Sequence, residues 1–224
     1  MSNIRHDAAE AARIVIESGA VYTRAGGDPF FFTSGWASPI FIDIKRLISL
    51  PAARDTLVEM ALDKINAVVG AGSFEMIAGC ELAGIPFAAL IADRLRLPLV
   101  VVRKQSKGFG RLAQFEGTFE PGSRALLVDD LSTDGINKAN FRSALEWAGA
   151  DVVGTFVLFD YDIFASGKTV TSVMTLADVI RAAEVGRQVG ARALEEVKAF
   201  AVDASRWSKR NGGIGALPRT SDAA

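Results

Sequence analysis

The sequence predicts an α/β fold with a central, mostly parallel β-sheet flanked by helices. Two observations indicate this class. Short apolar segments without strict polar–apolar alternation are separated by segments of helical periodicity, which is typical of strands buried on both faces. The chain also has 224 residues, of which 50% are hydrophobic and 23% charged, so it is long enough for one domain with a sizeable core.

The first part of the chain is expected to form a helix, a β element and a second helix. Apolar residues recur at helical spacing over 4–18, which predicts a helix. The stretch FFFTSGWASPIFIDI (30–44) is aromatic and β-branched, with Ser-Gly and Ser-Pro breaks, and indicates a hairpin-like β element. Pro51 is expected to open a helix through residue 69, because proline is well tolerated at the first helical position.

The rest of the chain alternates between strands and helices. Strands are expected at 74–80, 97–104, 124–131, 151–161 and 168–176, and helices at 84–96, 136–148 and within 177–207. We expect a single domain over 1–211, because no composition change marks a second one. The glycine-rich, polar stretch 212–224 is expected to be a disordered tail.

Composition excludes several classes of function. The 25 basic and 26 acidic residues give a net charge of −1, which argues against a nucleic-acid or membrane-surface binder. The single cysteine, Cys80, allows no intrachain disulfide and favours a reducing compartment. The single histidine, His6, lies in a polar segment and argues against a Ser-His-Asp triad or a multi-histidine metal site. We therefore expect a cytoplasmic protein with neither a nucleic-acid nor a membrane partner.

The stretch ALLVDDLSTDGINKANF (125–141) carries the clearest chemical signal. A buried strand ends at Asp129 and Asp130, and a Thr-Asp-Gly turn leads into a helix. The turn and the helix N-terminus offer backbone N–H groups to a phosphate. The two carboxylates suit ribose hydroxyls or, through water, Mg²⁺. The alternative is an ordinary strand–turn–helix with a solvated acidic corner.

Two further stretches are compatible with the same ligand. Residues 103–117 include Arg103, Lys104, Lys107 and Arg111 beside flexible glycines, as expected for a mobile lid that closes over a polyanion; the alternative is a solvated basic loop. The stretch TSGWASPIFID (33–43) suits an apolar cover over a flat ring; the alternative is a hairpin packed on the core.

These motifs resemble a known family. VDDLSTDG (128–135) is similar to the phosphoribosyl diphosphate (PRPP) signature of the type I phosphoribosyltransferases. Together with TSGWASPIFID, GCELAGIP (79–86) and RKQSKGFG (103–110), in this order, it resembles the orotate phosphoribosyltransferases. The resemblance implies the type I phosphoribosyltransferase fold, with a small β hood from about 1–50 and the C-terminal part. It also implies transfer of phosphoribosyl from PRPP to orotate with Mg²⁺, giving orotidine 5′-monophosphate and diphosphate in pyrimidine (UMP) biosynthesis.

The resemblance also implies roles for individual residues. Asp129 and Asp130 would hold the ribose hydroxyls, and Arg103, Lys104 and Lys107 would contact the pyrophosphate, so these five form the catalytic set. Arg103 and Lys107 would reach in from a partner subunit, which implies a homodimer with shared active sites. The 5′-phosphate would be bound by Leu131, Ser132, Thr133, Asp134, Gly135, Ile136 and Asn137. The orotate would be bound by Phe41 and Ile42 through their backbone, and by Thr33, Thr133 and Tyr161.

Several positions depart from the family pattern. Thr33 and Ala83 stand where lysines are usual, Phe109 where a histidine is usual and Tyr161 where an arginine is usual, while Ile136 and Asn137 replace small or hydroxyl residues. Arg24 and Arg111 are candidates for restoring the lost charge. Two alternatives stay open: a phosphoribosyltransferase for another nucleobase, and a non-catalytic regulator that binds a nucleotide or PRPP.

Overall fold

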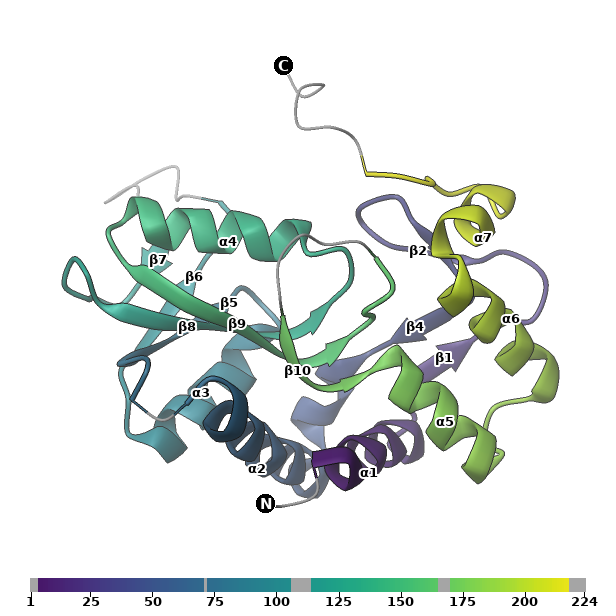
Figure 1. Ribbon diagram of the computed structural model, residues 1–224, viewed down its shortest axis with the longest axis horizontal. Helices are drawn as coiled ribbons and strands as arrows, with labels where there is room; N and C mark the ends of the chain where they lie inside the picture. Colours follow the sequence, from purple (N-terminus) through teal and green to yellow (C-terminus); the bar gives the residue numbers. More distant parts are fainter. Residues whose placement is uncertain (1–3, 71, 106–113, 165–169, 218–224) are drawn as a thin grey trace.

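The computed structural model describes residues 4–70, 72–105, 114–164 and 170–217 (Figure 1). Within these residues, six strands form the main sheet, in the order β10-β9-β8-β5-β6-β7. They are β5 (Met76–Cys80), β6 (Leu99–Val102), β7 (Phe115–Glu116), β8 (Arg124–Ser132), β9 (Asp151–Asp160) and β10 (Thr171–Thr175). All neighbouring strands are parallel except β6 and β7. The predicted α/β class with a mostly parallel sheet is therefore confirmed.

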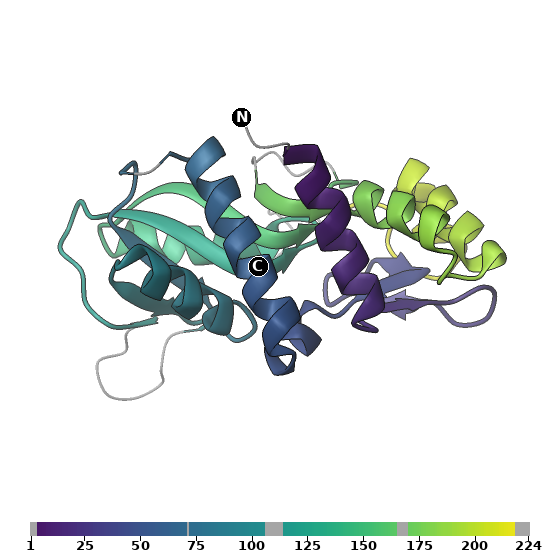
Figure 2. The same cartoon turned by 90° about the horizontal axis from the view of Figure 1, so that it is seen from below.

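Helices cover both faces of this sheet, which explains why its strands lack polar alternation. Below it in Figure 1, and in front of it in Figure 2, lie α1 (Ile4–Glu17), α2 (Pro51–Val68) and α3 (Gly84–Leu95). On the opposite face, above the sheet in Figure 1, lies α4 (Ile136–Trp147). The two sides of β8 illustrate the division. Leu126 and Val128 belong to the core on the α1–α3 side, whereas Leu127 packs with Phe141 and Leu145 of α4.

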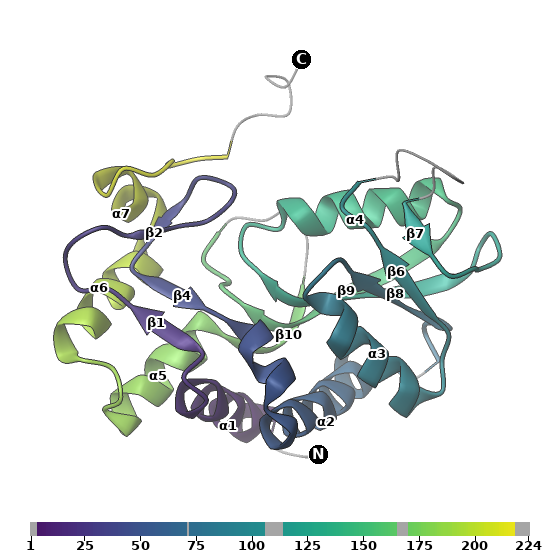
Figure 3. The ribbon, with the colours of Figure 1, turned by 180° about the vertical axis from the view of Figure 1, so that it is seen from behind.

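A smaller part of the molecule stands beside the sheet (Figure 3). We call it the hood and define it as two antiparallel strand pairs together with three C-terminal helices. The strands are β1 (Val21–Thr23) with β4 (Ile40–Ile42), and β2 (Phe30–Phe31) with β3 (Ala37–Ser38). The helices are α5 (Leu176–Gly186), α6 (Ala191–Val202) and α7 (Ala204–Arg210). A 3₁₀ helix, η1 (Ile44–Ser49), leads from the hood to α2.

The structure corrects two details of the expected C-terminal part. The helical pattern of 191–207 is broken at Asp203, whose side chain accepts a hydrogen bond from the Arg206 N–H and so starts α7 as a separate helix. The expected disordered tail is wrong for 212–217. There the Ile214 N–H donates to the Gly35 carbonyl and the Gly213 N–H to the Ser208 carbonyl, so this segment is bound to the hood. Residues 218–224 lie outside the described residues.

No helix among the described residues is long and apolar enough to cross a membrane.

Candidate active site

The two acidic residues predicted to bind ribose lie at the carboxyl end of β8. Asp129 and Asp130 are 5% and 7% exposed, and the Asp130 N–H donates to Asp129 Oδ1 at 2.9 Å. The first residue of α3, Gly84, makes room for them. A Cβ at this position would lie 2.6 Å from Asp129 Oδ1, so the close approach of α3 to β8 requires glycine.

A lysine that the sequence reasoning missed completes this group. Lys138, in the first turn of α4, places its Nζ 2.5 Å from Asp129 Oδ2. The Lys138 side chain is 11% exposed, so the ion pair is almost fully withdrawn from water. The pair therefore fixes Asp129 to the start of α4, immediately beside the predicted phosphate loop.

The local electrostatics follow from burial and from this pairing. Burial, and then the neighbouring Asp129 charge, raise the pKa of Asp130 to about 7. For Lys138, burial by itself lowers the pKa, but the attraction of Asp129 outweighs it and the pKa is raised. Burial also raises the pKa of the Cys80 thiol, and Cys80 is a core residue on the α4 side of the sheet. The Asp129–Lys138 ion pair and a second carboxylate with a raised pKa, Asp130, thus share the site.

The predicted phosphate loop connects β8 to α4. Gly135 has a positive φ of 79° and is the residue before α4, as the sharp entry to the helix requires. Asp134 Oδ1 accepts the Ile136 N–H at 3.2 Å, whereas Asp134 Oδ2 is buried without a hydrogen-bond partner among the described residues. Because the first turn of a helix leaves backbone N–H groups unpaired, this loop can bind an anion.

A second loop, between β5 and α3, forms the opposite side of the site. The carboxylate of Glu81 accepts the backbone N–H of Lys104 at 2.9 Å, which ties this loop to the end of β6. The Glu81–Leu82 peptide bond is cis. Arg103 pairs with Glu81 at 3.9 Å and with Glu116 at 3.7 Å, and it does not line the cavity of its own chain.

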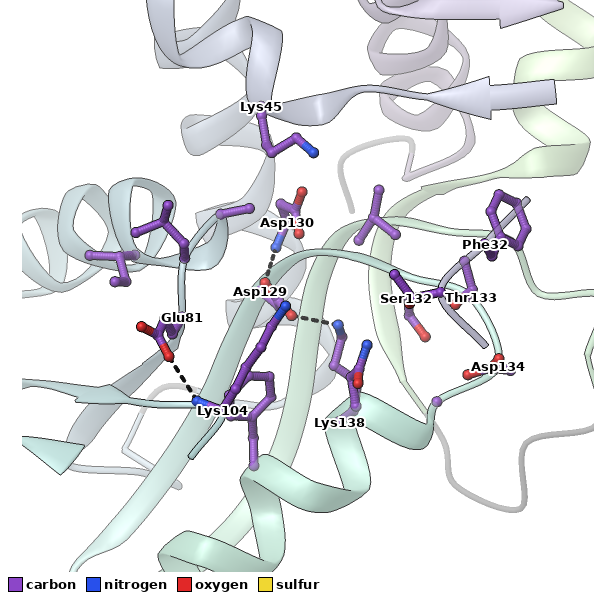
Figure 4. A pocket seen from close by; sticks show the side chains of 18 of the residues that line it. Phe32, Lys45, Glu81, Lys104, Asp129, Asp130, Ser132, Thr133, Asp134 and Lys138 are labelled. Carbon is purple, nitrogen blue, oxygen red and sulfur yellow. Dashed lines mark hydrogen bonds and ion pairs between the residues drawn. The ribbon is translucent and has the colours of Figure 1, made fainter. Parts of the chain in front are cut away.

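The hood supplies an apolar cover. Phe31, Phe32 and Phe41 face the site together with Thr33. These residues come from β2, from the turn after it and from β4. The site therefore combines an apolar wall, suited to a flat ring, with a polar floor (Figure 4).

Two residues expected to contact the base lie behind this wall. Tyr161 is fully buried, its ring centroid is 5.1 Å from that of Phe32, and its hydroxyl donates to the Ile40 carbonyl at 3.3 Å. Burial raises the pKa of this phenol, which stays neutral. The Ile42 side chain is also buried in the core, whereas the contact expected of Ile42 is through its backbone. The side chain of Tyr161 therefore supports Phe32 and does not reach the site, because its ring fills the space between the hood and β9.

One cavity of about 720 Å³ joins these parts, within the size range of small-molecule sites. Most predicted site residues line it: Thr33, Phe41, Lys104, Asp129, Asp130, Leu131, Ser132, Thr133, Asp134, Gly135 and Asn137. Four predicted residues do not: Ile42, Arg103, Ile136 and Tyr161. Lys107, with Phe109 and Arg111, lies outside the described residues.

Sequence reasoning assigned no role to three charged residues of this cavity: Lys45, Glu81 and Lys138. The sequence positions of Glu81 and Lys138 could have indicated a place in the site. Glu81 directly follows a strand, and Lys138 lies in the first helical turn after the predicted phosphate loop. The position of Lys45 gave no such indication, because Lys45 reaches the cavity only through the course that η1 takes after β4.

Comparisons with known proteins agree with this geometry. Residues 45–163 match the family described as phosphoribosyl transferase domain. The orotate phosphoribosyltransferase of Rhizobium etli (strain CIAT 652) is 42% identical over 209 residues, which cover 91% of each chain. That of Roseobacter denitrificans is 41% identical over 208 residues, covering 89% of this chain and 92% of the relative.

A solved structure gives the same result. The crystal structure of orotate phosphoribosyltransferase from Aeropyrum pernix is similar with a TM-score of 0.66 and 30% identity, over 79% of this chain and 98% of that one. The fold, the ordered motifs and these relatives lead to one conclusion. The chain belongs to the phosphoribosyltransferase family, in its orotate phosphoribosyltransferase branch.

Proposed function

We propose that this protein transfers the phosphoribosyl group of PRPP to orotate, forming orotidine 5′-monophosphate and diphosphate. The observation that carries the proposal is the arrangement inside one cavity. Asp129 and Asp130 lie between a helix-terminal anion loop and Lys104, under an apolar cover. A sugar that carries a phosphate at one end and a diphosphate at the other fits this order of groups.

The donor would bind along the floor of the cavity. The 5′-phosphate would accept hydrogen bonds from the backbone N–H groups of the loop from Leu131 to Asn137. The ribose hydroxyls would donate hydrogen bonds to the carboxylates of Asp129 and Asp130. The pyrophosphate would face Lys104 at the other end, where Glu81 holds the Lys104 backbone in place. Arg103 lies outside the cavity of its own chain, as expected of a residue donated to the site of a partner in a homodimer.

The reaction does not require a nucleophile from the protein. A deprotonated ring nitrogen of orotate attacks C1 of the ribose while the C1–oxygen bond to pyrophosphate breaks, and the ribose ring gains oxocarbenium character. The substrate is its own nucleophile. The protein positions the two substrates, places cations where the leaving group becomes negative and excludes water that would hydrolyse the donor.

Mg²⁺ fits this site only when it binds together with PRPP. Among the described residues, no group of three or more His, Cys, Asp or Glu side chains could hold a metal ion, and one carboxylate oxygen of Asp129 is already occupied by Lys138. The ion would be held by the oxygens of PRPP, with water linking it to Asp129 or Asp130. Bound there, it would neutralise charge on the pyrophosphate.

The test is the loss of orotate absorbance with purified protein, PRPP and Mg²⁺, repeated without metal. Metal-dependent turnover at roughly 1 s⁻¹ or faster is expected. If no turnover is seen but calorimetry still shows PRPP binding, the protein would instead be a phosphoribosyltransferase for another nucleobase or a non-catalytic regulator. Sedimentation at assay concentration tests the dimer, and localisation of a tagged protein tests the expected cytoplasmic compartment.

A further inference from the structure

The described residues that line the cavity include three cationic side chains: Lys45, Lys104 and Lys138. The proposed reaction accounts for two of them. Lys138 is paired with Asp129 on the floor, and Lys104 lies beside the Glu81 loop at the pyrophosphate end. Lys45 has no role in the reaction as described so far.

Lys45 enters the cavity from the hood side. It is the second residue of η1, directly after β4, and in Figure 4 it lies across the cavity from Lys138, with the two aspartates between them in this view. Its Nζ is 6.0 Å from the centroid of the Phe41 ring. The amine is therefore next to the apolar wall that would cover the base.

The Lys45 amine is available to a ligand. It forms a long ion pair with Asp43, whose Oδ1 lies 3.7 Å from Nζ, too far for a hydrogen bond. The side chain is 54% exposed, and no hydrogen bond joins it to the described part of the chain. An ammonium group has three N–H donors and no acceptor, so Lys45 can offer all three to an anion.

No other described cation of the hood lines the cavity. Arg24 turns away from the cavity. Its guanidinium donates to the Asp28 carbonyl at 2.6 Å and to the Pro29 carbonyl, and it stacks on the Phe30 ring. Thr33 is neutral, and Tyr161 is a buried neutral phenol. Lys45 is thus the cation of the described hood side that lines the cavity.

We propose that Lys45 Nζ binds the carboxylate of the pyrimidine base and so selects an acidic base over a neutral one. The inference rests on the proposed function and deepens it. Orotate differs from uracil by one ring carboxylate, and an apolar wall alone distinguishes such a pair poorly. A cation at the edge of that wall binds the charged base and leaves a neutral base without a partner.

The test compares two products that differ only in that carboxylate. Orotidine 5′-monophosphate and uridine 5′-monophosphate are titrated by calorimetry into the wild type, Lys45→Met and Lys45→Arg. In Lys45→Met, we expect affinity for the orotidine nucleotide to fall on the order of 10- to 100-fold, the usual range for a charge-assisted hydrogen bond. Affinity for the uridine nucleotide should stay within about twofold, and Lys45→Arg should retain most of the preference.

Lys64→Met is the matched control, since it removes the same charge from α2 and Lys64 does not line the cavity. It should bind both nucleotides as the wild type does. Steady-state kinetics add a second readout. Lys45→Met should raise the KM for orotate and leave the KM for PRPP unchanged.

Three outcomes would overturn the inference while leaving the proposed function intact. Each presumes that the wild type consumes orotate. The first is an equal loss of affinity for both nucleotides in Lys45→Met, and the second is no loss of affinity for either. The third is a raised KM for PRPP with an unchanged nucleotide preference, which would assign Lys45 to the pyrophosphate. A wild type that neither consumes orotate nor prefers the orotidine nucleotide would instead refute the proposed function itself.

Discussion

Lys138 Nζ lies 2.5 Å from Asp129 Oδ2, and this ion pair is almost completely buried inside the candidate active site. Burying two charges is favourable only when each has a well-placed partner. The pair links the end of β8 to the first turn of α4, on either side of the phosphate loop. It therefore couples the position of the carboxylate that we propose to bind ribose to the position of the loop.

Lys138→Met should destabilise the protein and weaken donor binding. Removing the amine leaves the Asp129 carboxylate buried without its partner, which costs about 3 kcal/mol in comparable cases. We expect a lower melting temperature and a KM for PRPP raised about tenfold or more, because the carboxylate loses its fixed position. The double variant Lys138→Met/Asp129→Asn is the control. It should be more stable than Lys138→Met alone, and a double variant that is no more stable would contradict the pairing.

Gly84→Ala should disturb the same carboxylate from the other side. A Cβ there would lie 2.6 Å from Asp129 Oδ1 and 2.9 Å from the Val128 carbonyl oxygen, and such overpacking costs about 1–3 kcal/mol. Denaturant unfolding should show this loss, with weaker PRPP binding by calorimetry. Gly190→Ala is the matched control, because a Cβ there meets nothing within 4 Å. Similar losses in both variants would show that the crowding at Asp129 is not the cause.

Ser208→Ala should loosen the hood. The buried Ser208 hydroxyl accepts the Ala37 N–H at 2.9 Å and donates to the Ile214 carbonyl at 2.6 Å. Leaving both groups unpaired should cost about 2 kcal/mol. Since Ala37 of β3 pairs with Phe31, which lines the cavity, the KM for orotate should rise more than the KM for PRPP. Ser143→Ala, at an exposed position of α4, should change neither constant.

Asp160→Asn should stabilise the protein at alkaline pH. Burial raises the folded-state pKa of Asp160 to about 6, above the roughly 3.9 of an unfolded chain. The folded state therefore binds more protons between about pH 4 and 6, and wild-type stability falls as pH rises through that window. The amide has no charge to bury. The melting temperature of Asp160→Asn relative to wild type should thus be higher at pH 8 than at pH 4.

Asp151→Asn, an exposed position at the start of the same strand, serves as the control for that experiment. Its melting temperature should follow the wild type across the pH range. An Asp160→Asn difference that is constant with pH would mean that the change acts through packing and not through the buried charge.

Lys107→Ala tests the basic segment predicted to close over the leaving group. If Lys107 neutralises the departing pyrophosphate, kcat should fall on the order of 10²-fold, as for other preorganised charge-stabilising groups. Single-turnover kinetics with saturating substrates measure this directly. A decrease in kcat of less than about fivefold would show that Lys107 does not stabilise the leaving group.

Local patterns were sufficient to predict five of the six strands of the sheet, all except the two-residue β7, together with most helices and the acidic end of β8. Apolar runs without alternation require burial on both faces, and a strand followed by a turn and a helix places Asp129 and Asp130 at the carboxyl edge. These relations involve residues close together in the chain. The sequence by itself thus determined the fold class, the motif proposed to bind the donor and the family resemblance.

Tertiary structure decided which side chains meet inside that frame. Tyr161 is enclosed by the hood, and residues 212–217 bind a turn near residue 35. Lys45 and Lys138 reach the cavity from opposite sides. Each outcome depends on the packing of segments far apart in sequence. Periodicity indicates whether a residue is buried, but it carries no information about the partner it is buried against.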